Sequence, residues 1–416
     1  MSKIASQGGI QPSMPTAFCI VAAALGAAMH IGKLPPAVPV LERVLGVTLL
    51  QAGFLLSLVQ FAGMCLGLMT GLAVQRMGLK RSMVGGLLVL GTASLLGSLA
   101  ESATWLLVTR AFEGLGFLWV VLPGPGLLRM LVPRERINSM MGVWGTYMPL
   151  GTSLALLLGP WAMLLGSQDS GWRIWWCLLS GVAILMALLL FWQVPSDRSV
   201  RDHAEAAAPD KSVTRTLLAL TLRSRPVWLM ALTFAVYAGQ WLAVVGFLPT
   251  IYAAAGVAST TAAWLTALAA ALNMVGNVVA GRLLEKGISA PVLLSAGFLV
   301  MGTGTLLAFG AHIGPWWQYA AIMAFSAVGG LIPATLFSLS IRLAPRPDAV
   351  SATVGWLQQW SSAGQFVVPP LMAWVAVRAG GWQWTGAVSA ALCIAGLCLA
   401  LSIRTELERL RSPRFQ

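Results

Sequence analysis

Four ionisable residues lie inside long apolar stretches of this chain, and their side chains allow charge or proton chemistry. His30 and Lys33 are three residues apart in one apolar run, and Arg110 and Glu113 are three residues apart in another. Residues three apart share a helix face. At membrane depth, an ionisable side chain costs about 2.5–3.5 kcal/mol unless it faces a partner or a cavity. These residues are therefore candidates for contact with a charged solute or a proton.

An alternative to solute or proton contact stays open for this set. In it, Arg110 and Glu113 pair along their own helix and Lys33 extends its ammonium toward the membrane surface. Pro35 and Pro36 interrupt the helix just beyond Lys33, which is typical of backbone that lines a cavity. His30 and Glu113 are the candidate proton carriers, since a histidine titrates readily near neutral pH and Glu113 is the sole acid well inside the N-terminal apolar runs.

Uncharged polar side chains in other apolar runs are further candidates for a solute pathway. Interhelical hydrogen bonding or packing is the alternative role for each of them. The candidates are Tyr147, Tyr237, Gln240, Asn273, Asn277, Gln358 and Gln359.

The composition excludes a soluble protein. The 416 residues are 58% hydrophobic and 9% charged, with a mean hydropathy of +0.81. Too few polar side chains exist to cover a water-facing surface, so the solvent must be lipid. The five cysteines lie in apolar runs without metal-type spacing, and no catalytic set or phosphate loop is present. We expect no cofactor, no metal and no enzymatic activity.

Twelve apolar runs are long enough to cross a bilayer of roughly 30 Å. They are predicted at residues 17–41, 50–74, 82–100, 104–128, 139–165, 173–193, 227–252, 260–283, 290–310, 316–341, 349–376 and 383–403. An even number places both termini on one side. Of the 26 Lys and Arg residues, 21 lie in segments on that side, which marks it as cytoplasmic. The net charge of +13 therefore predicts contact with anionic lipid headgroups and not nucleic acid.

A long polar segment divides the runs into six and six. We predict an N-terminal six-helix bundle over residues 1–193, a cytoplasmic linker over 194–226 with a surface helix near 211–222, and a C-terminal bundle over 227–416. The halves repeat landmarks at offsets of 210 to 214 residues. Leu122-Pro123 recurs as Ile332-Pro333, for example, and Leu34-Pro35 recurs as Leu248-Pro249.

A short basic loop is the most informative of these repeated landmarks. Gly71, Gln75, Arg76, Gly78, Lys80 and Arg81 form it in the first half, and Gly281, Glu285 and Lys286 repeat it in the second. This pattern resembles the cytoplasmic loop signature of the major facilitator superfamily, except that Gln75 stands where the family usually has Asp. Lys33-Leu-Pro-Pro36 resembles the corresponding segment of the cyanate-permease-like branch.

The resemblance implies an all-α membrane protein with twelve transmembrane helices in two parallel six-helix repeats. It also implies a central cavity lined by spans 1, 2, 4, 5, 7, 8, 10 and 11, and a gating role for the basic loop. We expect a monomeric secondary transporter of the inner membrane that takes up a small anionic solute with a proton. A proton-driven exporter of drugs or metabolites is the alternative, and a membrane sensor or channel is the alternative from another class.

Overall fold

The computed structural model describes residues 13–67, 77–133, 136, 140, 143–195, 211–311, 313–346 and 349–411. Within these ranges the regular elements are helices. In the first half they are α1 (Met14–Gly32), η1 (Pro35–Ala37), α2 (Val38–Leu45), α3 (Leu49–Ser57), η2 (Leu58–Gln60), α5 (Leu79–Ser98), α6 (Ala103–Val121), α7 (Gly124–Leu131), α9 (Tyr147–Met163) and α10 (Gly171–Gln193). In the second they are α12 (Lys211–Arg223), α13 (Arg225–Ala254), α14 (Ser259–Glu285), α15 (Ala290–Thr305), the π-helical η4 (Leu306–Gly310), α16 (Pro315–Gly329), α17 (Leu331–Leu343), α18 (Val350–Ala379) and α19 (Gln383–Arg411).

Over the residues that the structure describes, each of the twelve predicted spans coincides with one helix or with consecutive helical segments. Ten helical stretches of the described chain are long and apolar enough to cross a membrane. The other two predicted spans are α9, which has 17 residues, and α18, which has 30 residues and carries several polar side chains. The predicted fold class, an all-α membrane protein of twelve helices in two repeats, is confirmed.

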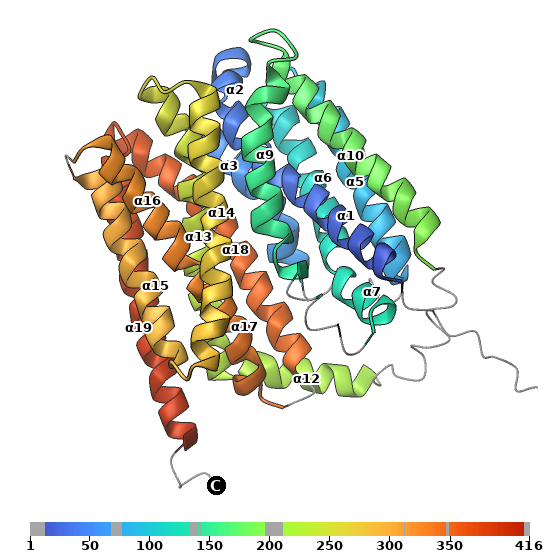
Figure 1. The fold of residues 1–416 in the computed structure, drawn as a ribbon, viewed down its shortest axis with the longest axis vertical. Coiled ribbons are helices and arrows are strands. Elements are labelled where there is room, and N and C mark those ends of the chain that lie inside the picture. The colour runs from blue at the N-terminus through green and yellow to red at the C-terminus, as the bar shows by residue number, and fades with distance from the viewer. Residues whose placement is uncertain are drawn as a thin grey trace, which may run out of the picture.

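The two halves of the chain lie side by side (Figure 1). Helices α1 to α10 occupy one side of the view and α13 to α19 the other, with α9 packed against α14 between them. Helix α2 lies at one end of the molecule, called the α2 end below. Helix α12 lies across the opposite end, near the C-terminus, and this is called the α12 end.

Prolines lie at breaks in three of the membrane-spanning segments. Proline has no N–H to donate, so it breaks the helical hydrogen-bond ladder. Pro35 and Pro36 separate α1 from α2 through the short η1, and Pro123 separates α6 from α7. In the second half, Pro333 lies in the first turn of α17, which follows the break at Gly330. The repeated Leu122-Pro123 and Ile332-Pro333 therefore lie at corresponding helix breaks in the two halves.

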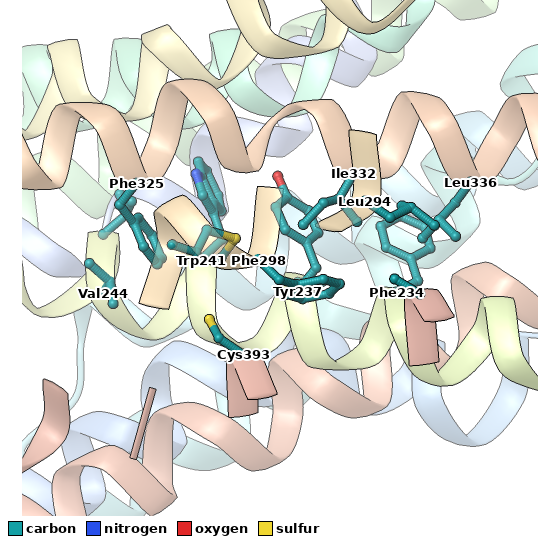
Figure 2. Close-up of a cluster of buried hydrophobic side chains, with 14 of the residues drawn as sticks. Phe234, Tyr237, Trp241, Val244, Leu294, Phe298, Phe325, Ile332, Leu336 and Cys393 are labelled. Atoms are coloured by element: carbon teal, nitrogen blue, oxygen red, sulfur yellow. The ribbon is translucent and has the colours of Figure 1, made fainter. Parts of the chain in front are cut away.

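Each half has its own apolar core. Figure 2 shows part of the C-terminal core, where Phe234, Tyr237 and Trp241 of α13 pack among side chains from α15, α16, α17 and α19. A second cluster joins α1, α5, α6, α7 and α10 in the N-terminal half. Because lipid tails are as apolar as these side chains, close packing, more than exclusion from water, holds such helices together.

A third apolar cluster joins the two halves at the α2 end. Leu34, Leu41 and Leu56 from the first half pack there with Phe247 and Ala373 from the second. The backbones also approach closely. A Cβ atom on Gly53 of α3 would lie 2.9 Å from the Cα of Pro370 in α18. In this conformation the halves are sealed together by apolar contact at the α2 end.

The close contact at a glycine between α5 and α6 leads to a prediction about stability. A Cβ atom at Gly116 would lie 2.6 Å from the Leu90 nitrogen and 2.7 Å from the Gly86 carbonyl oxygen. Gly116→Ala should therefore push α6 off α5 and cost about 1–3 kcal/mol, seen as a lower melting temperature of the purified protein. Gly85→Ala is the matched control in α5, because a Cβ atom there meets nothing within 4 Å. Equal melting temperatures for the two variants would contradict the predicted contact.

Candidate functional site

Lys33 lies at the end of α1, where the helix breaks. It is the C-cap of that helix and is 0% exposed. Its ammonium Nζ lies 2.5 Å from Glu113 Oε1 and donates to Ser94 Oγ at 2.8 Å. It also lies 4.6 Å from the centre of the Trp176 ring. Lys33 thus points into the N-terminal bundle and does not extend toward the membrane surface.

Glu113 joins the two cations of the cluster. Its Oε1 atom accepts from Lys33, and its Oε2 atom lies 2.6 Å from Arg110 Nη1, one turn back along α6. The pairing along a single helix, left open by the sequence, is therefore present together with a second pair to α1. One carboxylate serves two cations, and all three side chains are at most 2% exposed.

Arg110 also binds backbone carbonyls of two neighbouring helices. Its Nε atom donates to the Leu55 carbonyl of α3 at 3.0 Å, and Nη1 donates to the His30 carbonyl of α1 at 2.5 Å. The last carbonyls of a helix lack intrahelical partners, and a cation near them is favourable. Arg110 therefore stabilises the broken end of α1. Its Nη2 atom is buried without a hydrogen-bond partner.

His30 completes the cluster from the last turn of α1. Its Nδ1 atom lies 3.4 Å from Lys33 Nζ and 4.0 Å from Glu113 Oε2, and the ring is 0% exposed. Its Nε2 atom has no hydrogen-bond partner. The structure thus brings together all four ionisable residues singled out from the sequence, on two helices about 80 residues apart.

The charges of the cluster do not cancel. Lys33 and Arg110 carry two positive charges and Glu113 carries one negative charge, which leaves one positive charge when His30 is neutral. Buried charge is costly unless it is paired and hydrogen-bonded. With two unpartnered nitrogen atoms beside it, the cluster retains an unmet capacity to bind a negative group.

Sequence reasoning missed the side chains that support the cluster. Ser94 of α5 donates to the Trp176 carbonyl at 3.0 Å while it accepts from Lys33. Trp175 of α10 donates through Nε1 to the Lys33 carbonyl at 3.3 Å. Serine and tryptophan are common in membrane helices, so nothing in the sequence distinguishes these residues from packing positions.

Polar residues of the C-terminal half form two separate networks. Asn273 Nδ2 donates to Tyr237 Oη at 2.8 Å and to the Ser326 carbonyl at 3.0 Å, and Asn277 Nδ2 donates to the Asn273 carbonyl. In the other network, Gln240 Oε1 accepts from Ser389 Oγ at 2.5 Å. These hydrogen bonds lie within the C-terminal half, away from the Lys33–Glu113 pair.

A polar seam joins the two halves between α18 and the segment after α3, namely η2 and the helical residues that follow it to Gly67. Gln60 Nε2 donates to Gln365 Oε1 at 3.2 Å, and Ser362 Oγ donates to Gln60 Oε1 at 3.2 Å. Gln359 Nε2 donates to the Met64 carbonyl at 2.8 Å, whereas the neighbouring Gln358 is exposed. The sequence analysis did not single out Gln60, because nothing in the predicted run at 50–74 shows that this side chain meets the other half of the chain.

Tyr147 belongs to the N-terminal core. It lies in the first turn of α9, and its ring centre is 5.0 Å from that of Trp144. The tyrosine is 8% exposed. This position agrees with the packing alternative stated for it.

The basic loop is described only in part. Gly71, Gln75 and Arg76 lie outside the described residues. Gly78 has a φ of 99° at the start of α5, a conformation that favours glycine. Lys80 donates to the Val194 carbonyl at 2.6 Å, at the end of α10.

The remaining loop residues lie near helix ends. Arg81 is exposed at the start of α5. In the second half, Glu285 and Lys286 are exposed at the end of α14, and a Cβ atom on Gly281 would meet nothing within 4 Å.

The twelve-helix fold, its two repeats and its buried ionic cluster define a multi-pass membrane transporter. The family model described as Major Facilitator Superfamily matches residues 16–345 and 229–415. The chain belongs to this family, which places it among secondary transporters and not among enzymes. No curated protein matches the chain.

Solved structures share this fold. A bacterial homologue of the human lysosomal transporter Spinster, in an inward-facing and occupied conformation, has a TM-score of 0.72 at 16% identity, covering 93% of each chain. A D-xylose–proton symporter has a TM-score of 0.69 at 16% identity, covering 94% of this chain and 97% of that chain. At such low identity these neighbours establish the fold alone.

The ion pairs of Glu113 with Lys33 and Arg110 lead to a prediction about stability. Glu113→Gln should leave Lys33 and Arg110 without a buried counter-charge, a loss that typically costs about 3–5 kcal/mol. Lys33→Met combined with Glu113→Gln should recover much of this loss, because the double variant again has one uncompensated charge. Melting temperatures of the two single variants and the double variant measure the coupling. Additive effects would show that the Lys33–Glu113 pair contributes nothing.

Proposed function

We propose that the protein imports a small mono-anionic organic solute together with one proton across the inner membrane. The observation that carries this proposal is the buried cluster of two cations and one carboxylate, in which Arg110 Nη2 has no partner. Attraction between charges is stronger in a low-dielectric interior than in water. An anion entering the cluster would pair with the excess charge, whereas a cation would be repelled.

Protonation of the cluster would couple the proton to the anion. A proton on Glu113 removes the single counter-charge of Lys33 and Arg110, so the net charge rises from one to two. A proton on His30, whose Nδ1 lies 4.0 Å from Glu113 Oε2, raises the net charge in the same way. Each step strengthens anion binding, and by linkage the bound anion strengthens proton binding equally. Glu113 and His30 are therefore the proposed proton carriers.

The membrane potential supplies the reason for this coupling. An inside-negative potential opposes the entry of an anion by about 2.3 kcal/mol per charge per 100 mV. One co-transported proton makes the cycle electrically neutral. A solved neighbour described as a proton symporter supports proton coupling as a property that this fold can carry.

Access to the cluster requires the helices around it to move. Arg110 is covered by the Leu55 carbonyl of α3. Next to that carbonyl, the helix narrows into the 3₁₀ turn η2, whose Val59 oxygen would lie 2.6 Å from a Cβ atom on Gly114. We propose that α3 and η2 move away from α6 during the transport cycle, and that the polar seam between η2 and α18 separates and re-forms in the same movement. Tyr147, Tyr237, Gln240, Asn273, Asn277, Gln358 and Gln359 are the further residues proposed along the pathway.

The proposed topology places the α12 end in the cytoplasm. Residues 1–193 and 227–416 would form the two bundles of a monomer, with 194–226 as the linker between them and both termini inside. Arg76, Gly71 and Gly78 would hold the bundles together at that end when the transporter opens to the other side.

A labelling experiment tests this topology. Cysteines introduced singly between residues 196 and 210, in a variant lacking the five native cysteines, should react with a membrane-impermeant thiol reagent only after the inner face is exposed. Reaction from the outer face of intact cells would contradict the proposed orientation.

Uptake into proteoliposomes tests the proposed function. Thermal stabilisation first selects ligands from a panel of small anions, cations and neutral compounds. Uptake of the selected anion should accelerate when the outside is made more acidic than the lumen. Lys33→Ala and Arg110→Ala should each abolish uptake, and Lys33→Arg should retain part of it.

A matched control separates the cluster from general charge effects. Arg43 is an exposed arginine of α2 that pairs with Asp169, so Arg43→Ala should transport at the wild-type rate. Normal uptake by Lys33→Ala would contradict the anion proposal. Preference for a lipophilic cation would favour the exporter alternative.

A further inference from the structure

A shallow, open groove of about 580 Å³ lies on the surface between α18 and α19, apart from the ionic cluster. Small side chains leave it open, namely Ala379 on α18 and Ala387 and Ala391 on α19. From Trp384 to Ala391 the groove follows α19 for seven residues, about 10 Å at 1.5 Å per residue. It therefore extends from the end of the helix into the depth of the bilayer.

One cation lies beside this groove, near its end. Arg378 is in the last turn of α18, directly before Ala379 and the left-handed cap at Gly380. Its guanidinium carbon lies 5.9 Å from the centre of the Trp374 ring, and the side chain is exposed. None of the ion pairs among the described residues includes Arg378. The groove thus combines apolar walls with one uncompensated positive charge.

Two exposed tryptophans mark the level of the membrane surface. Trp374 is 49% exposed and Trp384, in the first turn of α19, is 60% exposed. Tryptophan is enriched at the boundary between hydrocarbon and headgroups. Arg378 lies four residues beyond Trp374, toward the end of the helix, which places its guanidinium at headgroup level. The apolar lining continues from there along Val388 to Ala391.

We infer that this groove is a binding site for one anionic phospholipid of the leaflet at the α2 end. Its phosphate contacts Arg378, and one acyl chain lies along Ala387 and Ala391 between the two helices. Charge complementarity selects an anionic over a zwitterionic headgroup, because no carboxylate in the described part of the chain pairs with Arg378. The indoles of Trp374 and Trp384 flank the glycerol region. This site is independent of the transported solute and of the coupling proton.

Native mass spectrometry of the detergent-solubilised protein tests the site. The probes are a phosphatidylglycerol and a phosphatidylcholine with identical acyl chains. Phosphatidylglycerol should bind more tightly than phosphatidylcholine. Arg378→Gln should weaken phosphatidylglycerol binding about fivefold, as expected for one arginine at headgroup level, and should leave phosphatidylcholine binding nearly unchanged.

Two further variants make the result specific to the groove. Ala387→Leu should fill the groove and displace both lipids, and its melting temperature shows whether it folds; Ala391→Leu replaces it if it does not. Arg43→Gln removes an exposed arginine of α2 outside the groove and should bind both lipids as the wild type does. Equal weakening by Arg43→Gln and Arg378→Gln, or equal affinity for the two lipids in the wild type, would overturn the proposal.

Discussion

The N-terminal half of this protein depends on one carboxylate shared by two cations inside the membrane. Glu113 holds Lys33 of α1 and Arg110 of its own helix at 2.5 and 2.6 Å. Removing three charged groups from water costs several kcal/mol per ion, and only close pairing with further hydrogen bonds offsets this cost. Ser94, the Leu55 carbonyl and the His30 carbonyl supply those hydrogen bonds. The cluster thus couples the break in α1 to the positions of α3, α5 and α6.

The interface between the halves changes character along its length. At the α2 end, leucines from the first half pack on Phe247 and Ala373, and Gly53 allows α3 and α18 to approach at Pro370. Beyond α3, in η2, the contact with α18 becomes a set of amide and hydroxyl hydrogen bonds around Gln60 and Gln365. Neutral hydrogen bonds within membranes contribute little each, roughly 0.6 kcal/mol on average. Such a seam separates and re-forms at low cost, which suits a surface that opens and closes.

Much of the fold was predictable because the bilayer imposes one simple constraint. A crossing helix needs about 20 apolar residues, so hydropathy and the positions of basic residues predict the spans. The repeat was visible because landmarks such as Pro123 and Pro333 lie at corresponding breaks. Ionisable side chains inside these helices were also recognisable one by one, because charged residues are rare in apolar runs. His30, Lys33, Arg110 and Glu113 were found in this way.

The partners of these residues were not predictable. Lys33 and Glu113 are 80 positions apart, and only the packing of α1 against α6 decides that they meet. The direction of Lys33, inward toward Ser94 and Trp176, depends on the helix break and on α10. Gln60 was missed because its role exists only across the interface between the halves. Spacing along a chain reveals shared helix faces, but it contains no information on which faces meet.

The coupling assigned to Glu113 is tested most directly by anion affinity as a function of pH. With the anion selected by thermal stabilisation, isothermal titration calorimetry of the wild type should show affinity that rises as the pH falls, because protonated Glu113 no longer neutralises Lys33 and Arg110. Glu113→Gln, which imitates the protonated acid, should bind the anion tightly and depend less on pH than the wild type. His30→Gln should also depend less on pH, because both residues are the proposed proton carriers. Loss of anion binding in a Glu113→Gln variant whose melting transition shows that it folds, or an affinity that is independent of pH in the wild type, would contradict the role of Glu113.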